Sequence, residues 1–254
     1  MFPSLIFIVF QACVLWVASL RLRDSSLMDR FWGSSFVVVM FILFTGGAIS
    51  TGTAMLLFMI SLWGLRLSYH VTVRNWGKGE DPRYFAIRES ISGYPWKSFF
   101  MVFLFQGGLV AIVSLPLFSY AAGKGNDSWG WMETIGTSVW ALGLLVEIIA
   151  DEQLRRYRVD DSPNKKEVMD RGLWALSRHP NYVGEALIWW GIWAYTFSFE
   201  SPWAIFSPIL MTWLLRYFTG VEHLERHMFK TRKSYSSYAK KVPVFWPKPI
   251  GRTS

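Results

Sequence analysis

The sequence contains a single cysteine, Cys13, and few charged residues for its length. One cysteine cannot form an intramolecular disulfide or supply a cysteine-based metal cluster. Only 17% of the 254 residues are charged, whereas soluble chains carry about 25%. The shortfall is concentrated in long uncharged runs, which are typical of segments that cross the hydrocarbon core of a bilayer. The composition therefore indicates an integral membrane protein.

Motifs of the common soluble cofactor and metal sites are also absent. The sequence has no GxGxxG after a strand, no P-loop, no HExxH and no CxxC, which excludes a soluble-type Rossmann domain. No metal site is predicted. The net charge of +8 comes from basic residues in the gaps between apolar runs, so a membrane surface explains it better than nucleic acid.

Apolar sequence is abundant, at 52% of the residues. Runs of nearly 20 residues with few charges suit a helix that crosses a bilayer. They occur at roughly 4–20, 32–48, 52–69, 98–120, 133–150, 182–199 and 202–219. The sequence thus predicts an all-α, polytopic membrane protein of about seven transmembrane helices, forming one membrane domain over 1–254.

The basic residues alternate between loops. Lysine and arginine crowd the first, third and fifth loops and the tail, while the other loops are nearly free of them. Because basic loops mark the cytoplasmic side, the N-terminus is predicted outside or in the lumen, with the C-terminal tail in the cytosol. The membrane would be the endoplasmic reticulum in a eukaryote and the inner membrane in a bacterium.

Several predicted spans carry ionisable residues near their cytoplasmic ends. They are Arg66, His70, Glu147, Asp151, Glu185 and Arg216. Ionisable groups inside a membrane are costly and usually functional, so these residues are predicted to line one polar cavity. Snorkelling or buried ion pairs are the alternative explanation.

The stretch Ser177–Glu185 begins the sixth span, with Pro180 suited to the first helical turn. The exposed amide groups of a helix start attract anions, and Arg178 and His179 add donors for a phosphate or a carboxylate. A simple interfacial helix cap is the alternative. The loop 74–84 is either a lid or a solvated surface loop, and the tail from Val221 is predicted to contain an amphipathic helix.

These residues resemble a known family. The run Gly172–Trp174, then Ser177–Glu185, then Trp189–Gly191, is similar to the C-terminal domain of steroid 5-alpha-reductase-like membrane proteins. The resemblance is to the branch described as a domain of unknown function, DUF1295. It includes Glu80–Tyr84 and Glu147–Leu154, and the C-terminal part is expected at about 133–250.

The resemblance implies an NADPH-dependent reductase that acts on a carbon–carbon double bond of a steroid-like or sterol-like lipid. The residues that it assigns to the cofactor are Glu147, Asp151, Arg158, Arg178, His179, Asn181, Arg216 and Tyr238. Glu185 is expected to order the same pocket. Steroid 5-alpha-reductases also use an acid and a tyrosine of the N-terminal half to polarise the substrate ketone. Span two, 32–50, has no acid, so Tyr84 and Tyr182 are proposed as substitute donors.

Two other functions fit the same residues. The run Arg178–Gly184 also resembles membrane methyltransferases of the isoprenylcysteine and phospholipid types, which bind S-adenosylmethionine. The stretches Glu80–Tyr84 and Glu147–Leu154 favour the reductase. A non-enzymatic lipid-binding protein that keeps the fold is the third hypothesis. All three predict membrane lipids and a lipid ligand as partners.

Overall fold

The computed structural model describes residues 1–45, 49–123, 129–162, 165–218 and 221–247, and in these ranges the chain is helical with no strand. It forms two compact units. The first comprises Met1–Gly130 and Thr196–Phe206, and the second comprises Trp131–Tyr195 and Ser207–Ser254. The all-α prediction is therefore confirmed, and each unit is described by itself.

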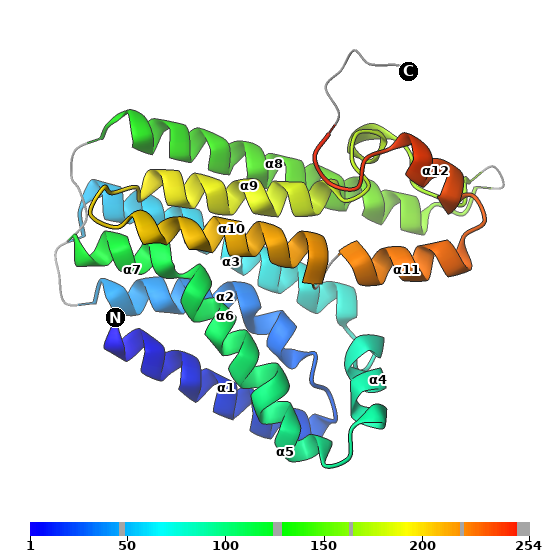
Figure 1. Cartoon of the computed structure of the whole chain (residues 1–254), viewed down its shortest axis with the longest axis horizontal. Coiled ribbons are helices and arrows are strands. Elements are labelled where there is room, and N and C mark those ends of the chain that lie inside the picture. The colour runs from blue at the N-terminus through cyan, green and yellow to red at the C-terminus, as the bar shows by residue number, and fades with distance from the viewer. Residues whose placement is uncertain (46–48, 124–128, 163–164, 219–220, 248–254) are drawn as a thin grey trace. The chain divides into compact units, whose positions relative to one another are not determined.

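The first unit contains α1 (Phe2–Leu22), α2 (Leu27–Leu43), α3 (Thr51–Asn75), α4 (Pro82–Ser90), α5 (Tyr94–Ser98), the π-helix η1 (Phe99–Leu104), α6 (Phe105–Val113), α7 (Leu115–Ala122) and the 3-10 helix η3 (Pro202–Ile205). In this unit α2 packs along α3, and α1 packs on α2, η1 and α6 (Figure 1).

Two glycines allow α2 and α3 to approach closely. A Cβ atom on Gly33 would lie 2.2 Å from the carbonyl oxygen of Gly64, so neither helix has room for a methyl group there. Beside this contact the rings of Phe36 and Trp63 are fully buried, with centroids 5.5 Å apart. The glycine contact therefore fixes the α2–α3 pair at backbone distance.

The second unit contains α8 (Trp131–Val159), the 3-10 helix η2 (Gly172–Ala175), α9 (Pro180–Tyr195), α10 (Phe206–Trp213), the π-helix η4 (Leu214–Phe218), α11 (Val221–Thr231) and α12 (Tyr235–Lys241). Helices α8 and α9 lie side by side (Figure 1). Gly143 faces Gly184, since a Cβ on Gly143 would lie 2.7 Å from the Gly184 oxygen. Gly136 and Gly191 make the same kind of contact nearer the other end.

Four helical segments in the described ranges are long and apolar enough to cross a membrane: Phe2–Leu22, Thr51–Asn75, Tyr94–Val113 and Trp131–Val159. They coincide with predicted spans one, three, four and five, and they support a membrane protein. Helices α2 and α9 have 17 and 16 residues, and the seventh predicted span is divided between η3, α10 and η4. The count of seven spans stays a prediction.

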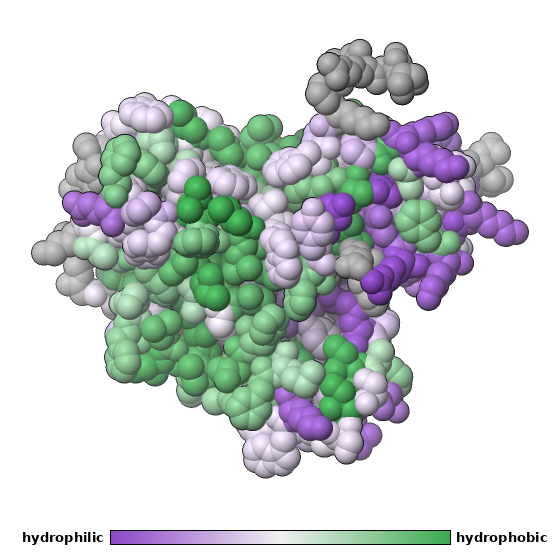
Figure 2. All heavy atoms as spheres, in the orientation of Figure 1, coloured by the Kyte–Doolittle hydropathy of each residue, from purple (hydrophilic) through white to green (hydrophobic). Residues whose placement is uncertain are grey.

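The surface of the protein divides by character. Figure 2 shows hydrophobic side chains over the long helices of the first unit. In the second unit, hydrophilic side chains gather over α11 and α12. Charged residues are thus concentrated outside the apolar helices, as expected where lipid surrounds one part of a chain and water another.

We predict that Gly33→Ala destabilises the first unit by about 1–3 kcal/mol, because the added methyl overlaps the α3 backbone. The measurement is thermal unfolding of the detergent-purified protein, followed by tryptophan fluorescence. Gly108→Ala on α6 is the matched control, since its Cβ meets nothing within 4 Å. Equal stability of the two variants would contradict the close contact.

Candidate functional site

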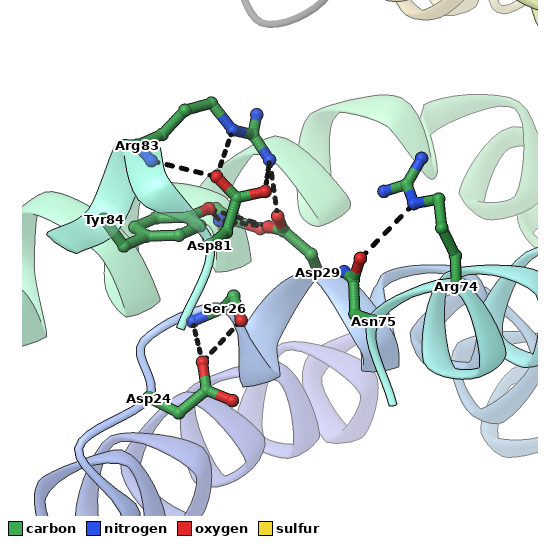
Figure 3. A network of polar contacts seen from close by, with 9 residues as sticks. Asp24, Ser26, Asp29, Arg74, Asn75, Asp81, Arg83 and Tyr84 are labelled. Atoms are coloured by element: carbon green, nitrogen blue, oxygen red, sulfur yellow. Dashed lines mark hydrogen bonds and ion pairs between the residues drawn. The ribbon is translucent and has the colours of Figure 1, made fainter. Parts of the chain in front are cut away.

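The first unit holds a polar cluster around Asp29, in the first turn of α2. We call Asp29, Asp81, Arg83, Tyr84 and Gln106 the Asp29 cluster. The Tyr84 hydroxyl donates to Asp29 Oδ1 at 2.7 Å, and Arg83 Nη2 donates to Oδ2 at 3.1 Å. Figure 3 shows Arg83 and Tyr84 of α4 pointing toward Asp29. Gln106 Nε2 donates to Asp29 Oδ1 at 3.1 Å and to the Tyr84 oxygen at 2.7 Å.

Helix α4 places Arg83 and Tyr84 because its start is well defined. Asp81 caps the helix by accepting a bond from the Arg83 backbone N–H at 2.9 Å, and Pro82 is the first helical residue. Burial acts to raise the pKa of Asp81, but the hydrogen bonds and charge of Arg83 outweigh burial and lower it. The cap is therefore ionised at neutral pH, and it holds the guanidinium beside Asp29.

Glu80 attaches the beginning of the same segment to the connection between α1 and α2. Its carboxylate accepts the Ser25 backbone N–H at 2.7 Å and the Arg88 guanidinium at 2.8 and 2.9 Å. Arg88 Nη2 also lies 3.3 Å from the Ser25 hydroxyl. Two carboxylates, Glu80 and Asp29, thus fasten α4 to the start of α2.

The Tyr84 phenol is a hydrogen-bond donor at neutral pH. Burial, the charge of Asp29 and the hydrogen bond to Asp29 raise the pKa of Tyr84 well above 10. The site is not sealed from its surroundings, because the Asp29 side chain remains 21% exposed. A protonated phenol next to a carboxylate and an amide is a suitable group to hold the oxygen of a ligand.

Sequence reasoning found Tyr84 but missed Asp29 and Gln106. Residues 32–50 lack an acid as predicted, but the helix of that span begins earlier, at Leu27, and includes Asp29. Gln106 is uncharged, so a search for ionisable residues passes over it. A glutamine in an otherwise apolar run, FFMVFLFQGGLV, was the available signal.

The second unit holds another cluster around Glu225 on α11. Its members are Arg178, His179, Glu225 and Tyr235, and we call it the Glu225 cluster. Arg178 Nη1, His179 Nε2 and the Tyr235 hydroxyl each lie 3.2 Å from Glu225 Oε1. Burial acts to raise the pKa of Glu225, but the bonds and charges from His179, Arg178 and Tyr235 outweigh burial and lower it. Burial also lowers the pKa of His179, despite Glu225.

The start of α9 positions Arg178 and His179 as the sequence predicts. Pro180 is the first residue of α9, and the Ser177 hydroxyl accepts the His179 backbone N–H at 3.2 Å. The Arg178 backbone N–H donates to the Pro243 oxygen at 2.9 Å. The C-terminal tail therefore holds the stretch that carries the two donors.

A pocket of about 430 Å³ opens beside Glu225. Its lining comprises Arg216, Tyr217, Val221, Glu225, Arg226 and Phe229. Two guanidinium groups, one carboxylate and two aromatic rings thus surround one cavity, whose size is within the range of small-molecule sites. In the ranges that the structure describes, no three His, Cys, Asp or Glu side chains gather in a way that suits a metal ion.

The other predicted site residues of the second unit lie on α8, α9 and α12. Glu147 is buried at Gly184, Asp151 is half-buried, and Arg158 is exposed at the end of α8. Glu185 is buried on α9. The Tyr238 hydroxyl donates to the Trp174 oxygen at 2.5 Å, so it fastens the tail to η2.

Two polar atoms near the start of α9 are buried without a partner among the described residues. They are Arg178 Nε and Asn181 Oδ1. Buried polar atoms normally have hydrogen-bond partners, and each exception needs an explanation. The ring of Tyr182 is stacked on that of His179, with centroids 5.7 Å apart and planes at 7°. This stretch therefore has the capacity to bond a further polar group.

The structure unites Arg178 and His179, while Arg216 lines the pocket that includes their partner Glu225. Tyr84 belongs to the other unit. Glu225, Arg226 and Phe229 were missed individually, since the tail was interpreted as a single amphipathic segment. The alternation of apolar and charged residues from Val221 predicts the helix, which is α11, but not the groups that Glu225 bonds.

We predict that Glu225→Gln lowers the stability of the second unit at pH 7, because Arg178 loses its counter-charge. The Glu225 pKa is lower in the folded state than its ordinary 4.5, so its stabilising contribution is present above pH 4.5 and is lost as the pH falls through the lowered pKa. Thermal unfolding between pH 3 and 8 measures the difference. A difference that does not shrink in acid would contradict the ion pair.

The model of the family described as "Protein of unknown function (DUF1295)" matches residues 15–242. An uncharacterised protein of Schizosaccharomyces pombe, C594.04c, is 26% identical over 271 aligned positions, covering 94% of this chain and 77% of the relative. No solved structure matches. The chain belongs to the DUF1295 family, which is of the steroid 5-alpha-reductase-like type.

Proposed function

We propose that this protein is an NADPH-dependent membrane reductase of a carbon–carbon double bond conjugated to a carbonyl group in a lipid. The observation that carries the proposal is the pocket beside Glu225, with two arginines, one carboxylate and two aromatic rings. Family membership adds to it, because the family is steroid reductase-like. Fold kinship alone does not fix a reaction, so the chemistry of the two clusters must support it.

The pocket residues fit a phosphorylated dinucleotide. Arg216 and Arg226 are suited to phosphate, because guanidinium groups form paired, charge-assisted bonds with its oxygens. Glu225 is an acceptor for ribose hydroxyls, and the rings of Tyr217 and Phe229 offer stacking surfaces. The unpartnered Arg178 Nε and Asn181 Oδ1 lie in the stretch that the family resemblance assigns to the cofactor.

The same features favour NADPH over S-adenosylmethionine. S-adenosylmethionine has no phosphate and offers the two lining arginines only its single carboxylate. NADPH carries a pyrophosphate and a 2′-phosphate, so each guanidinium has an anionic partner. The methyltransferase is therefore the second choice, and a non-enzymatic lipid-binding protein is the third.

When bound, NADPH supplies a hydride. Within the first unit, we propose that the Asp29 cluster is a site for the oxygen of a lipid. The Tyr84 hydroxyl donates its single hydrogen to Asp29 Oδ1 at 2.7 Å. A ligand oxygen that takes the place of Asp29 Oδ1 would accept this hydrogen bond instead.

We propose positioning roles for the remaining site residues. Tyr182 holds the His179 ring by stacking, and Glu185 orders the inner face of α9. Glu147 and Asp151 have positioning roles on α8. The Tyr238 hydroxyl holds the C-terminal tail against η2. We further propose seven spans with a cytosolic C-terminus, in the endoplasmic reticulum or a bacterial inner membrane, because the loop charges alternate.

NADPH is expected to raise the unfolding temperature of the detergent-purified protein, because a ligand that binds only the folded state stabilises it. NADH should give a smaller shift, since it lacks the 2′-phosphate. A shift with S-adenosylmethionine and none with NADPH would replace the reductase by the methyltransferase. No shift with either would favour the lipid-binding protein.

Arg216→Ala and Arg226→Ala should each weaken NADPH binding by roughly 10–100-fold, the usual worth of a charged hydrogen bond. Isothermal titration with NADPH measures this loss. Arg155→Ala on α8 is the matched control, because Arg155 is exposed and paired with Glu152. If all three variants bind NADPH alike, the pocket is not the phosphate site.

A further inference from the structure

The last turns of α1 and the first turn of α5 meet within the first unit (Figure 1). The Trp16 indole N–H donates to the Pro95 oxygen at 2.8 Å, and the ring centroids of Trp16 and Trp96 are 5.3 Å apart. Further along, the Tyr94 hydroxyl donates to the Ser25 hydroxyl at 2.8 Å. These contacts hold the end of α1, and the connection after it, against the start of α5.

The meeting point lies at the end of two apolar helical segments. Phe2–Leu22 and Tyr94–Val113 are both long and apolar enough to cross a membrane, and the contacts join the end of the first to the beginning of the second. Trp96 is 73% exposed there, and tryptophan is enriched where membrane meets water. The surface of a membrane therefore lies at the level of this contact.

Three cationic side chains are exposed at the same level. Arg21 lies in the last turn of α1, Arg23 is its C-terminal cap, and Lys97 lies in α5. Among the residues that the structure describes, none of the three forms an ion pair. Arg23 also has a φ of 53°, in the left-handed region that favours glycine, so an arginine occupies a position where its side chain adds strain.

The acids held at this connection already have partners. Asp24 pairs with Arg30 at 2.7 Å, and Glu80 pairs with Arg88 at 2.8 Å. Neither acid is therefore available as the counter-ion of the three exposed cations. The site has a surplus of positive charge that an anion from outside the chain can balance.

Exposed apolar side chains continue from the cations along both helices. Val14 and Val17 precede Arg21 at the spacing of one helix face, and Phe100 and Met101 follow Lys97. Positive charge at the membrane surface, with apolar side chains directed to the hydrocarbon core, matches the two ends of a phospholipid. A free anion in water would use only the charged end.

We propose that Arg21, Arg23 and Lys97 bind the headgroup of an anionic phospholipid, beside the ring of Trp96. Guanidinium groups form charge-assisted bonds with phosphate oxygens. Phosphatidylcholine also has a phosphate, but its choline cation is repelled by the three positive charges, so a lipid with net negative charge is preferred. Anionic lipids are found in the cytoplasmic leaflet, which agrees with the proposed cytosolic side of this loop. The inference does not depend on the reductase reaction.

The test titrates the full-length, detergent-purified protein with dioleoyl phosphatidylglycerol or with dioleoyl phosphatidylcholine, and native mass spectrometry gives the dissociation constant of the first lipid bound. We expect the wild type to bind phosphatidylglycerol roughly 10–100-fold more tightly, because each cation near a membrane surface favours an anionic lipid by about fivefold. The site variant, Arg21→Gln with Arg23→Gly and Lys97→Gln, should bind the two lipids about equally. Glycine is chosen at position 23 because it suits the positive φ.

The matched control removes three charges from the tail of the second unit. Lys230→Gln, Lys240→Gln and Lys241→Gln change exposed lysines that form no ion pair among the described residues. This tail variant should keep the preference for phosphatidylglycerol. If it loses the preference as fully as the site variant does, net charge is responsible and the inference is overturned.

Three other results would also overturn the inference. The first is a site variant that keeps the preference. The second is loss of the wild-type preference when inorganic phosphate is added at the lipid concentration, which would assign the cations to a free anion. The third is a wild-type dimer without lipid preference that the site variant cannot form, which would assign this face to a second copy. If the site variant does not fold, Lys97→Gln alone decides, by losing or keeping about fivefold of the preference.

Discussion

A carboxylate withdrawn from water must be met by donors, and this requirement organises both units. In the first unit Asp29 is met by Arg83, Tyr84 and Gln106. In the second, Glu225 is met by Arg178, His179 and Tyr235. Breaking a buried pair costs about 3–5 kcal/mol, and the cost is smaller for the partly exposed pair of Asp29 and Arg83 than for Glu225 and Arg178. The two acids thus help to fix the positions of the short helices α4 and α11. The candidate functional groups are the side chains that donate hydrogen bonds or form ion pairs with these two carboxylates.

Much of the helical framework could be predicted from apolar runs. The expected spans at 52–69 and 133–150 lie inside α3 and α8, and Pro180 begins α9 as its chemistry requires. Helix α2 begins before the predicted span, because Leu27 and Met28 are followed by the charged Asp29 and Arg30, which end a hydropathy run but not a helix. A hydropathy profile indicates which segments tolerate contact with lipid. A helix, in contrast, extends as far as its backbone hydrogen bonds continue.

The polar partners could not be predicted, since they depend on which helix faces meet. Two π-helical segments make this plain: η1 precedes Gln106, and η4 contains Arg216. No residue pattern in FFMVFL or LLRYF announces the altered turn. Because a π-turn rotates the side chains that follow it in the same helix, the faces of such helices do not follow from a period of 3.6 residues. Tertiary contacts carry that information.

The glycine contacts between α8 and α9 have a mechanical consequence. Where a carbonyl oxygen stands 2.7 Å from the place of a missing Cβ, the two helices interlock and cannot slide along each other. The two helices therefore form one rigid pair. The tail beyond them is held both by a small apolar cluster of Val168, Tyr235, Tyr238 and Val242 and by polar bonds, such as Arg178 to Pro243 and Tyr238 to Trp174. The α8–α9 pair is therefore the rigid support on which the tail packs.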